Sequence, residues 1–193
     1  GAAPLRFTRP QTKKDKPTLR RPAARATHAL QAAARRYAAD SVPPRDPSFA
    51  RLTPEDVVSL TAAAGGPGPS AVTDAPTLAR FNTDWTGAFR GASSLALRPA
   101  TVGAASAILA YCNARRLAVV PQGGNTGLVG GGVPVYDEVV LSTDRMNRVL
   151  SVDAEAGTLT AEAGCTLAAL DAAAAEVGLA APLDIGARGS CAV

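Results

Sequence analysis

The residues of this chain best suited to chemistry lie in one glycine-rich stretch, 121–134. Six of its fourteen residues are glycine, and it also carries the polar side chains of Gln122, Asn125 and Thr126. Glycine permits positive φ and a close approach of the backbone to a ligand. Successive peptide N–H groups in such a loop can form a nest that binds an anion. We therefore expect this loop to bind a phosphate or a pyrophosphate.

The stretch differs from the two common nucleotide-binding loops. A dinucleotide-binding turn reads G-x-G-x-x-G and opens a helix, whereas Gly130–Gly132 and Pro134 disfavour a helix here. A P-loop requires Gly-Lys followed by Ser or Thr, and the chain has no such run. A long connection without a ligand is the alternative, but mere flexibility would not require the three polar side chains.

Other catalytic chemistry has little support. The single histidine, His28, lies in a basic tail, so a histidine base or metal ligand is excluded from the rest of the chain. The three cysteines form no C-x-x-C pair, which argues against disulfides and a cysteine zinc site. Ser190 and Cys191 lack a histidine partner and are not expected to act as nucleophiles. We predict no catalytic residue and no metal site.

The charge is unevenly distributed. Residues 1–39 hold ten Lys or Arg and one acid, which leaves 20 − 10 = 10 basic and 16 − 1 = 15 acidic residues elsewhere. Such a tail can bind an anionic surface such as nucleic acid or lipid, or it can be an Arg-rich, acid-poor organelle transit segment. We favour the transit segment, and hence the mitochondrial matrix, because 27–39 could form a short basic helix. No apolar run approaches the length of a transmembrane helix.

Apolar spacing and capping signals predict an α+β fold. Thr53 and Pro54 begin one helix, which ends near Gly65, and Thr101 begins another that ends at Arg116. The apolar residues of the second helix are expected on one face: Val102, Ala105, Ile108, Leu109 and Cys112. Further helices are predicted over 73–81 and 166–177, single strands over 95–97, 117–120 and 139–142, and a hairpin over 149–161.

Three segments carry a resemblance to a known family. These are 121–140, 141–149 and 182–191, and they occur in the family's order. The chain resembles the D-2-hydroxyglutarate dehydrogenase family of flavoproteins, which share the FAD domain of vanillyl-alcohol oxidase and PCMH type. The resemblance runs from about Arg51 to Cys191. In the family the chain continues with His-Ile-Gly-Gly-Asn, whereas here Ala192-Val193 follow.

The resemblance implies the fold and the cofactor site. The expected fold is α+β, the first subdomain of a PCMH-type FAD-binding domain, incomplete at the C-terminus. The chain is expected to divide into a basic tail over 1–50, which its composition predicts to be largely disordered and which has transit-peptide character, a helical N-terminal extension over 51–89, and the truncated FAD-binding domain over 90–193. The cofactor-binding residues implied are Pro121, Gln122, Gly123, Gly124, Asn125, Thr126, Gly127, Leu128, Gly130, Gly131, Pro182, Gly186, Gly189, Ser190 and Cys191.

The resemblance also implies an activity. The complete enzyme would pass a hydride from D-2-hydroxyglutarate to FAD, giving 2-oxoglutarate, and an electron-accepting flavoprotein would be its partner. The alternatives are a D-lactate or glycolate dehydrogenase of the same family, or a non-catalytic remnant of the FAD domain that serves as a structural subunit in a larger assembly. Nucleic acid is not an expected partner. Residues 1–193 alone are expected to be inactive and to retain FAD poorly.

Overall fold

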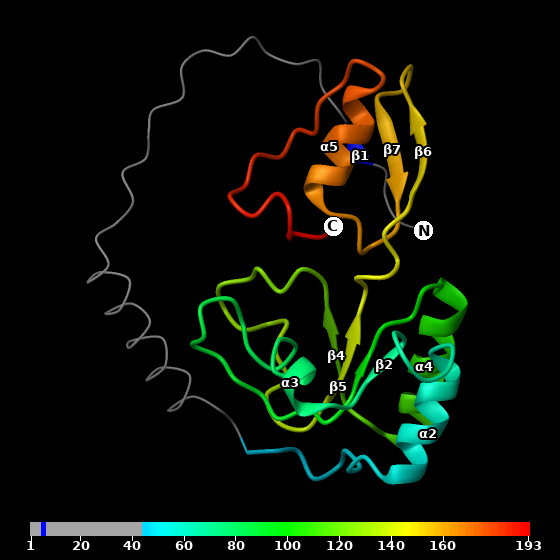
Figure 1. Ribbon diagram of the computed structural model, residues 1–193, viewed down its shortest axis with the longest axis vertical. Helices are drawn as coiled ribbons and strands as arrows, with labels where there is room; N and C mark the ends of the chain where they lie inside the picture. Colours follow the sequence, from blue (N-terminus) through cyan, green and yellow to red (C-terminus); the bar gives the residue numbers. More distant parts are fainter. Residues whose placement is uncertain (1–4, 7–43) are drawn as a thin grey trace, which may run out of the picture.

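The computed structural model describes residues 5–6 and 44–193 (Figure 1). The predictions for the basic tail, including its short helix and its disorder, concern residues outside the described part. The described residues form two sheets with separate cores. Figure 1 shows them as two parts, the first sheet below and the second above, and the chain passes from one to the other along 143–148.

The first sheet has the strand order β2-β3-β5-β4. Strand β2 (Ala71–Val72) is antiparallel to β3 (Ala96–Leu97), whereas β3, β5 (Val139–Ser142) and β4 (Val119–Gln122) run parallel. Every residue of β5 is buried. A continuous apolar run of this kind is typical of a parallel strand that is covered on both faces.

Helices cover the two faces of this sheet. Helices α2 (Pro54–Ala63) and α4 (Val102–Arg115) lie side by side on one face, where Leu60 and Ile108 pack with Val139. The short helix α3 (Ala75–Leu78) lies on the other face, and Leu78 packs with Val140 there. Alternate residues of β5 therefore serve opposite cores, as strand geometry requires.

The second sheet has the order β1-β7-β6, with all strands antiparallel. Strands β6 (Val149–Asp153) and β7 (Thr158–Ala161) form a hairpin, and β1 (Leu5–Arg6) pairs with the edge of β7. Helix α5 (Leu167–Ala175) packs on the hairpin, and its Leu170 and Ala174 form a small core with Leu159 and Cys165.

Most predicted elements are confirmed, including both long helices, the parallel strands, the hairpin and the last helix. The predicted apolar face of α4 is partly wrong, because Val102 is 74% exposed and Leu109 is 46% exposed. The sheet and α2 meet α4 along a narrow line at Ile108 and Cys112, so the outer residues stay in water. Strand β2 was not predicted, since its two residues are defined only by pairing with β3.

The predicted domain boundaries stay predictions, but the packing bears on them. Residues 51–89 contribute α2 to the main core and β2 to the main sheet. These elements therefore share one core with strands from the expected FAD-binding domain.

The buried carboxylate of Asp56 fastens α2 to α4. It is 1% exposed, and it accepts hydrogen bonds from Arg115 Nε at 2.8 Å, the Tyr111 hydroxyl at 2.9 Å and the Thr53 amide at 3.0 Å. The Arg115 hydrogen bond holds the pKa of Asp56 well below its usual value of 3.8, against the opposite effect of burial. The ionised form therefore stabilises the fold above about pH 4, and this stability is lost as the pH falls through the lowered pKa.

Asp56→Asn should lower the free energy of unfolding by about 2–3 kcal/mol at pH 7, because hydrogen bonds to a buried charged group are lost. Urea unfolding at several pH values measures this. The gap to the unsubstituted protein should shrink as the pH falls below 4, because the Asp56 carboxylate of the unfolded chain then takes up a proton while the native carboxylate, with its lowered pKa, is still ionised. Glu55→Gln, on the exposed side of the same turn, is the control. An equal loss in that variant, or a gap that does not change with pH, would contradict this role.

Candidate functional site

A cavity of about 220 Å³ lies where the two parts meet. One wall comes from the start of the glycine-rich loop, a second from the connection after β5, and a third from the start of α5 and the C-terminal segment. The lining residues are Gly123, Gly124, Asp144, Asn147, Gly164, Thr166, Ala169, Ser190 and Ala192. The loop leaves the carboxyl end of β4, the end of a parallel sheet at which ligands ordinarily bind.

The polar side chains of the loop hold its shape. Gln122 is 3% exposed, and its Nε2 donates to the carbonyls of Phe81 at 2.9 Å and Gly132 at 2.6 Å, which ties the two ends of the loop together. Asn125 adopts a left-handed conformation, φ +51°, and its Nδ2 donates to the Thr83 carbonyl at 2.9 Å. Both amide groups are thus used within the protein, and their contact with a ligand remains a prediction.

The backbone N–H groups of the loop, unlike these side-chain amides, are not paired within the described part of the protein. Within the described part of the chain, the N–H groups from Gly123 to Gly132 donate to no carbonyl and no side chain. The turn is closed instead by the amide of Val133, which donates to the Gly130 carbonyl at 3.0 Å. A run of unpaired amides in a glycine-rich loop is suited to an anion that accepts several hydrogen bonds at once.

Two glycines permit the loop and its neighbours to pack. A Cβ added at Gly124 would lie 1.6 Å from the Ser190 carbonyl oxygen, and one at Gly164 would lie 1.9 Å from the Thr143 carbonyl oxygen. Glycine is required at these positions by protein packing. Gly127 and Gly131 differ, because a Cβ there would meet no protein atom within 4 Å and neither has a positive φ. These two positions are exposed, with open space where a side chain would lie.

The predicted segment 182–191 is tied to α5. The Leu167 amide donates to the Cys191 carbonyl at 2.9 Å and the Ala168 amide to the Arg188 carbonyl at 2.8 Å. The Ala169 amide donates to the Thr166 side chain, so the first amides of α5 are already paired. Of the residues predicted in this segment, Ser190 lines the cavity, whereas Pro182, Gly186, Gly189 and Cys191 are not among the lining residues.

Of the predicted loop residues, Gly123 and Gly124 line the cavity, and the others are not among its lining residues. Pro121 belongs to β4, and Gly130 packs against Phe89. The remaining predicted positions, Thr126, Gly127, Leu128 and Gly131, lie along the loop, and Leu128 is 67% exposed. The structure thus brings Gly123, Gly124 and Ser190 together.

Arginine side chains neutralise the one carboxylate in the cavity wall. Arg98 approaches Asp144 with Nε 3.0 Å from both carboxylate oxygens and a terminal nitrogen 2.9 Å from Oδ2. Arg80 lies 3.8 Å from the same carboxylate. Because opposite charges this close offset each other, Asp144 does not make the cavity repel an anion.

Several lining residues were not predicted. Asp144 and Asn147 lie in the connection that follows β5, so their position after a predicted parallel strand was a usable signal. Thr166, the N-cap of α5, was predicted only as the start of a helix, and Gly164 was not among the predicted site residues. Ala169 and Ala192 carry no signal, because an alanine side chain does not indicate a ligand.

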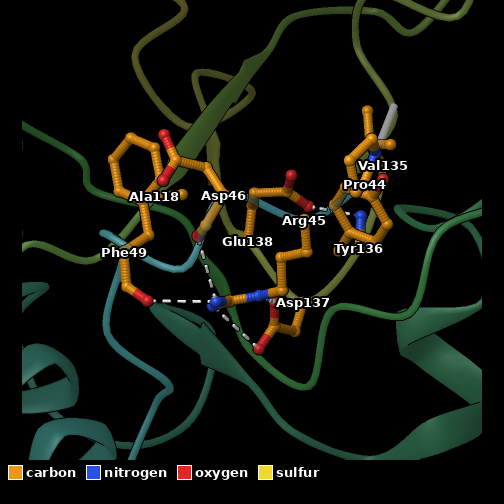
Figure 2. Close-up of a pocket in the computed structure, with 9 residues that line it drawn as sticks. All are labelled: Pro44, Arg45, Asp46, Phe49, Ala118, Val135, Tyr136, Asp137 and Glu138. Atoms are coloured by element: carbon orange, nitrogen blue, oxygen red, sulfur yellow. Dashed lines mark hydrogen bonds and ion pairs between the residues drawn. The ribbon is translucent and has the colours of Figure 1, made fainter. Parts of the chain in front are cut away.

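A second pocket of about 250 Å³ lies beside the start of β4 (Figure 2). Its lining includes Arg45, but that guanidinium is fully engaged: it donates to Asp137 at 2.6 Å and to the carbonyls of Phe49 and Ala50 at 3.0 Å. The Arg45 hydrogen bond holds the pKa of Asp137 below its usual value. With its cation paired and Glu138 also in the lining, this pocket is poorly suited to a phosphate. The Arg45–Asp137 ion pair joins the segment that precedes α2 to the residues before β5.

Two further observations concern only the described residues. They contain no cluster of three or more His, Cys, Asp or Glu side chains placed to hold a metal ion. None of their helices has both the length and the apolar character needed to cross a membrane.

Comparisons with known proteins agree with this geometry. A family model described as FAD binding domain matches residues 93–193. A mitochondrial D-2-hydroxyglutarate dehydrogenase of Danio rerio is 48% identical over 151 residues, which are 78% of this chain and 28% of that protein. A mitochondrial Schizosaccharomyces pombe protein provisionally named D-lactate dehydrogenase is 46% identical over 154 residues, 77% of this chain and 29% of that protein. The chain thus spans less than a third of the length of these relatives.

Solved structures support the fold. An alkyldihydroxyacetonephosphate synthase aligns with TM-score 0.63 and 19% identity over 79% of this chain and 30% of its own. A p-cresol methylhydroxylase with bound substrate aligns with TM-score 0.54 and 22% identity over 64% of this chain and 24% of its own. The predicted PCMH-type α+β fold is therefore confirmed.

The packing at Gly124 makes a prediction about stability. Gly124→Ala should lower the melting temperature by several degrees, because a Cβ cannot occupy the space of the Ser190 carbonyl and the C-terminal segment must move. Gly127→Ala, in the same loop but with open space, should leave the melting temperature nearly unchanged. Thermal unfolding followed by circular dichroism measures both. Equal melting temperatures for the two variants would disprove the close contact.

Proposed function

Because this chain belongs to the FAD binding domain family, we propose that it forms the diphosphate-binding part of a flavoenzyme that oxidises D-2-hydroxyglutarate. The family match over 93–193 supports the cofactor, and the Danio rerio relative's name supports the substrate. The chain covers only part of that relative, so the activity is proposed for the complete protein.

The observation that carries this proposal is the run of unpaired amides from Gly123 to Gly132. It begins at the cavity, at the carboxyl end of a parallel strand, beside a carboxylate whose charge Arg98 offsets. A diphosphate offers several acceptor oxygens and two negative charges, which such amides can satisfy together. A neutral ligand would leave most of these N–H groups without an acceptor.

FAD, when bound, would accept the hydride that leaves the substrate carbon. The residues of this chain would hold and orient it. The loop amides would take the diphosphate, and the open positions at Gly127 and Gly131 would allow the ligand to contact the backbone. Gly124 and Gly164 would keep the two parts close enough to share the cavity. Substrate chemistry is thus assigned to other parts of the complete protein.

A second candidate is a D-lactate or glycolate dehydrogenase built on the same FAD domain. The name of the Schizosaccharomyces pombe relative favours D-lactate. Both candidates would use the cavity in the same way, because the cofactor and its diphosphate are the same. They differ in the 2-hydroxyacid, and a substrate assay of the complete protein separates them.

We also propose a mitochondrial location, in the matrix, with an electron-accepting flavoprotein as partner. The names of the relatives support the mitochondrial location, and the basic, acid-poor composition of 1–39 fits a transit segment. Residues 1–39 fused to a fluorescent reporter should carry it to mitochondria. A reporter that stays in the cytosol would contradict the transit role.

The cofactor assignment is tested at the two open glycines. Gly127→Ala and Gly131→Ala should each weaken FAD binding about ten-fold or more, equal to about 1.4 kcal/mol, because a Cβ would fill space needed by the ligand. Titration of the flavin-free complete protein with FAD measures the dissociation constant. The control is Gly103→Ala on the exposed surface of α4, which should bind FAD normally. Unchanged affinity in both loop variants would argue against the diphosphate site.

The activity is tested by turnover. The complete protein should reduce a dye with D-2-hydroxyglutarate faster than with D-lactate or glycolate. Residues 1–193 alone should not, because good sites enclose about 70–90% of their ligand. In addition, the substrate hydroxyl must lose its proton while the hydride leaves the carbon, and this calls for a base or a metal. Only His28 could supply a histidine base in this chain. Turnover by 1–193 alone would refute this division of roles, and faster D-lactate oxidation would favour the second candidate.

A further inference from the structure

A short excursion of the chain, residues 82–91, packs against the glycine-rich loop. It closes on itself at its base, where Thr83 and Arg90 form an antiparallel bridge and the Gly91 amide donates to the Asn82 carbonyl at 2.8 Å. The side chain of Asn82 exchanges two hydrogen bonds of 2.8 Å with the backbone of Ser93. The excursion is therefore a closed unit with a fixed base.

A buried carboxylate organises the interior of this unit. Asp84 is 4% exposed, and it accepts the amides of Thr86 at 3.1 Å and Phe89 at 2.9 Å together with the Thr86 hydroxyl. Burial raises the pKa of Asp84, but these hydrogen bonds outweigh that effect and hold it below its usual value. A buried carboxylate is costly unless it is satisfied in this way, so Asp84 fixes the positions of Thr86 and Phe89.

The unit touches the glycine-rich loop at three places. Asn125 donates to the Thr83 carbonyl near the start of the loop. The Phe89 ring lies against Gly130, where an added Cβ would be 2.6 Å from the ring. Gly91 lies against Pro134 at the end, where an added Cβ would be 2.1 Å from the Pro134 carbonyl oxygen. The start, the middle and the end of the loop are therefore each held.

These contacts leave the ligand side of the loop free. Within the described residues, the cavity lining includes none from 82–91, and a Cβ added at Gly127 or Gly131 would meet no atom of the excursion. The excursion can therefore act on a ligand only through the shape of the loop. Binding sites that are held by a packed outer layer lose affinity when that layer is loosened.

We propose that residues 82–91 form a brace that sets the loop in its ligand-binding shape, with Phe89 and Asp84 as positioning residues. This inference rests on the proposed FAD site. Because the backbone amides of the loop have no protein partner, its conformation depends on the Gln122 and Asn125 side chains and on contacts with the brace. Phe89 presses on the loop directly, and Asp84 acts through Phe89.

The test compares the FAD affinity of brace variants with their stability. Phe89→Ala should raise the dissociation constant for FAD about ten-fold or more, since small displacements of a binding loop are costly. Phe89→Leu, which keeps an apolar side chain against Gly130, should restore most of the affinity. Leu60→Ala in the remote core of α2 is the control, and it should lower the urea midpoint but leave the dissociation constant of the folded protein unchanged.

Asp84→Asn gives an independent measurement. Trp85 is the only tryptophan of this chain and is 65% exposed on the brace, so its emission in the 1–193 chain reports on the brace. Loss of the carboxylate should change its emission and its quenching by acrylamide, and in the complete protein the same variant should bind FAD more weakly. This measurement does not depend on Phe89→Ala being folded.

The outcomes separate the two proposals. Normal FAD binding by the unsubstituted protein, with equal affinity in Phe89→Ala and Asp84→Asn, would overturn the brace alone. A matching loss of affinity in Leu60→Ala would also overturn it, because general destabilisation would then explain the effect. Failure of the unsubstituted complete protein to bind FAD would overturn the proposed function, and the brace with it.

Discussion

Two backbone-to-backbone contacts, at Gly124 and Gly164, are the constraint on which the rest of the structure depends. At each, a neighbouring carbonyl oxygen occupies the space of a side chain. The first brings the glycine-rich loop against Ser190, and the second brings the turn before α5 against the connection that follows β5. Together they join two sheets that have separate cores. The cavity exists because the two parts meet at glycine and not at larger residues.

The loop shows how a protein can keep backbone donors free for a ligand. Unpaired amides are costly in a protein interior, and here they lie in an exposed loop whose shape is set by other groups. The side-chain amides of Gln122 and Asn125 donate to protein carbonyls. These side chains therefore hold the loop in place, while its backbone N–H groups remain available to bind a ligand. The brace over 82–91 extends the same division of roles, because it holds the loop without entering the cavity.

Three carboxylates of the described part are each paired with an arginine. Asp56 joins α2 to α4 through Arg115. Asp137 pairs with Arg45 and so holds the segment that precedes α2. In the cavity wall, the charge of Asp144 is offset by Arg98. The first two pairs serve packing. The third also serves the site, because an unpaired carboxylate there would oppose an anionic ligand.

The sequence by itself determined the elements and the kind of ligand. Helix caps at Thr53, Thr101 and Thr166 and the apolar run of β5 are local signals, so α2, α4, α5 and the parallel strands could be predicted, and the glycine-rich loop indicated a phosphate. Only the tertiary structure decided which residues meet. The burial of α4 depends on what packs against it, so Val102 and Leu109 were misjudged. Thr166 and Ala192 reach the cavity, and Phe89 reaches the loop, through contacts between distant segments, which no local spacing encodes.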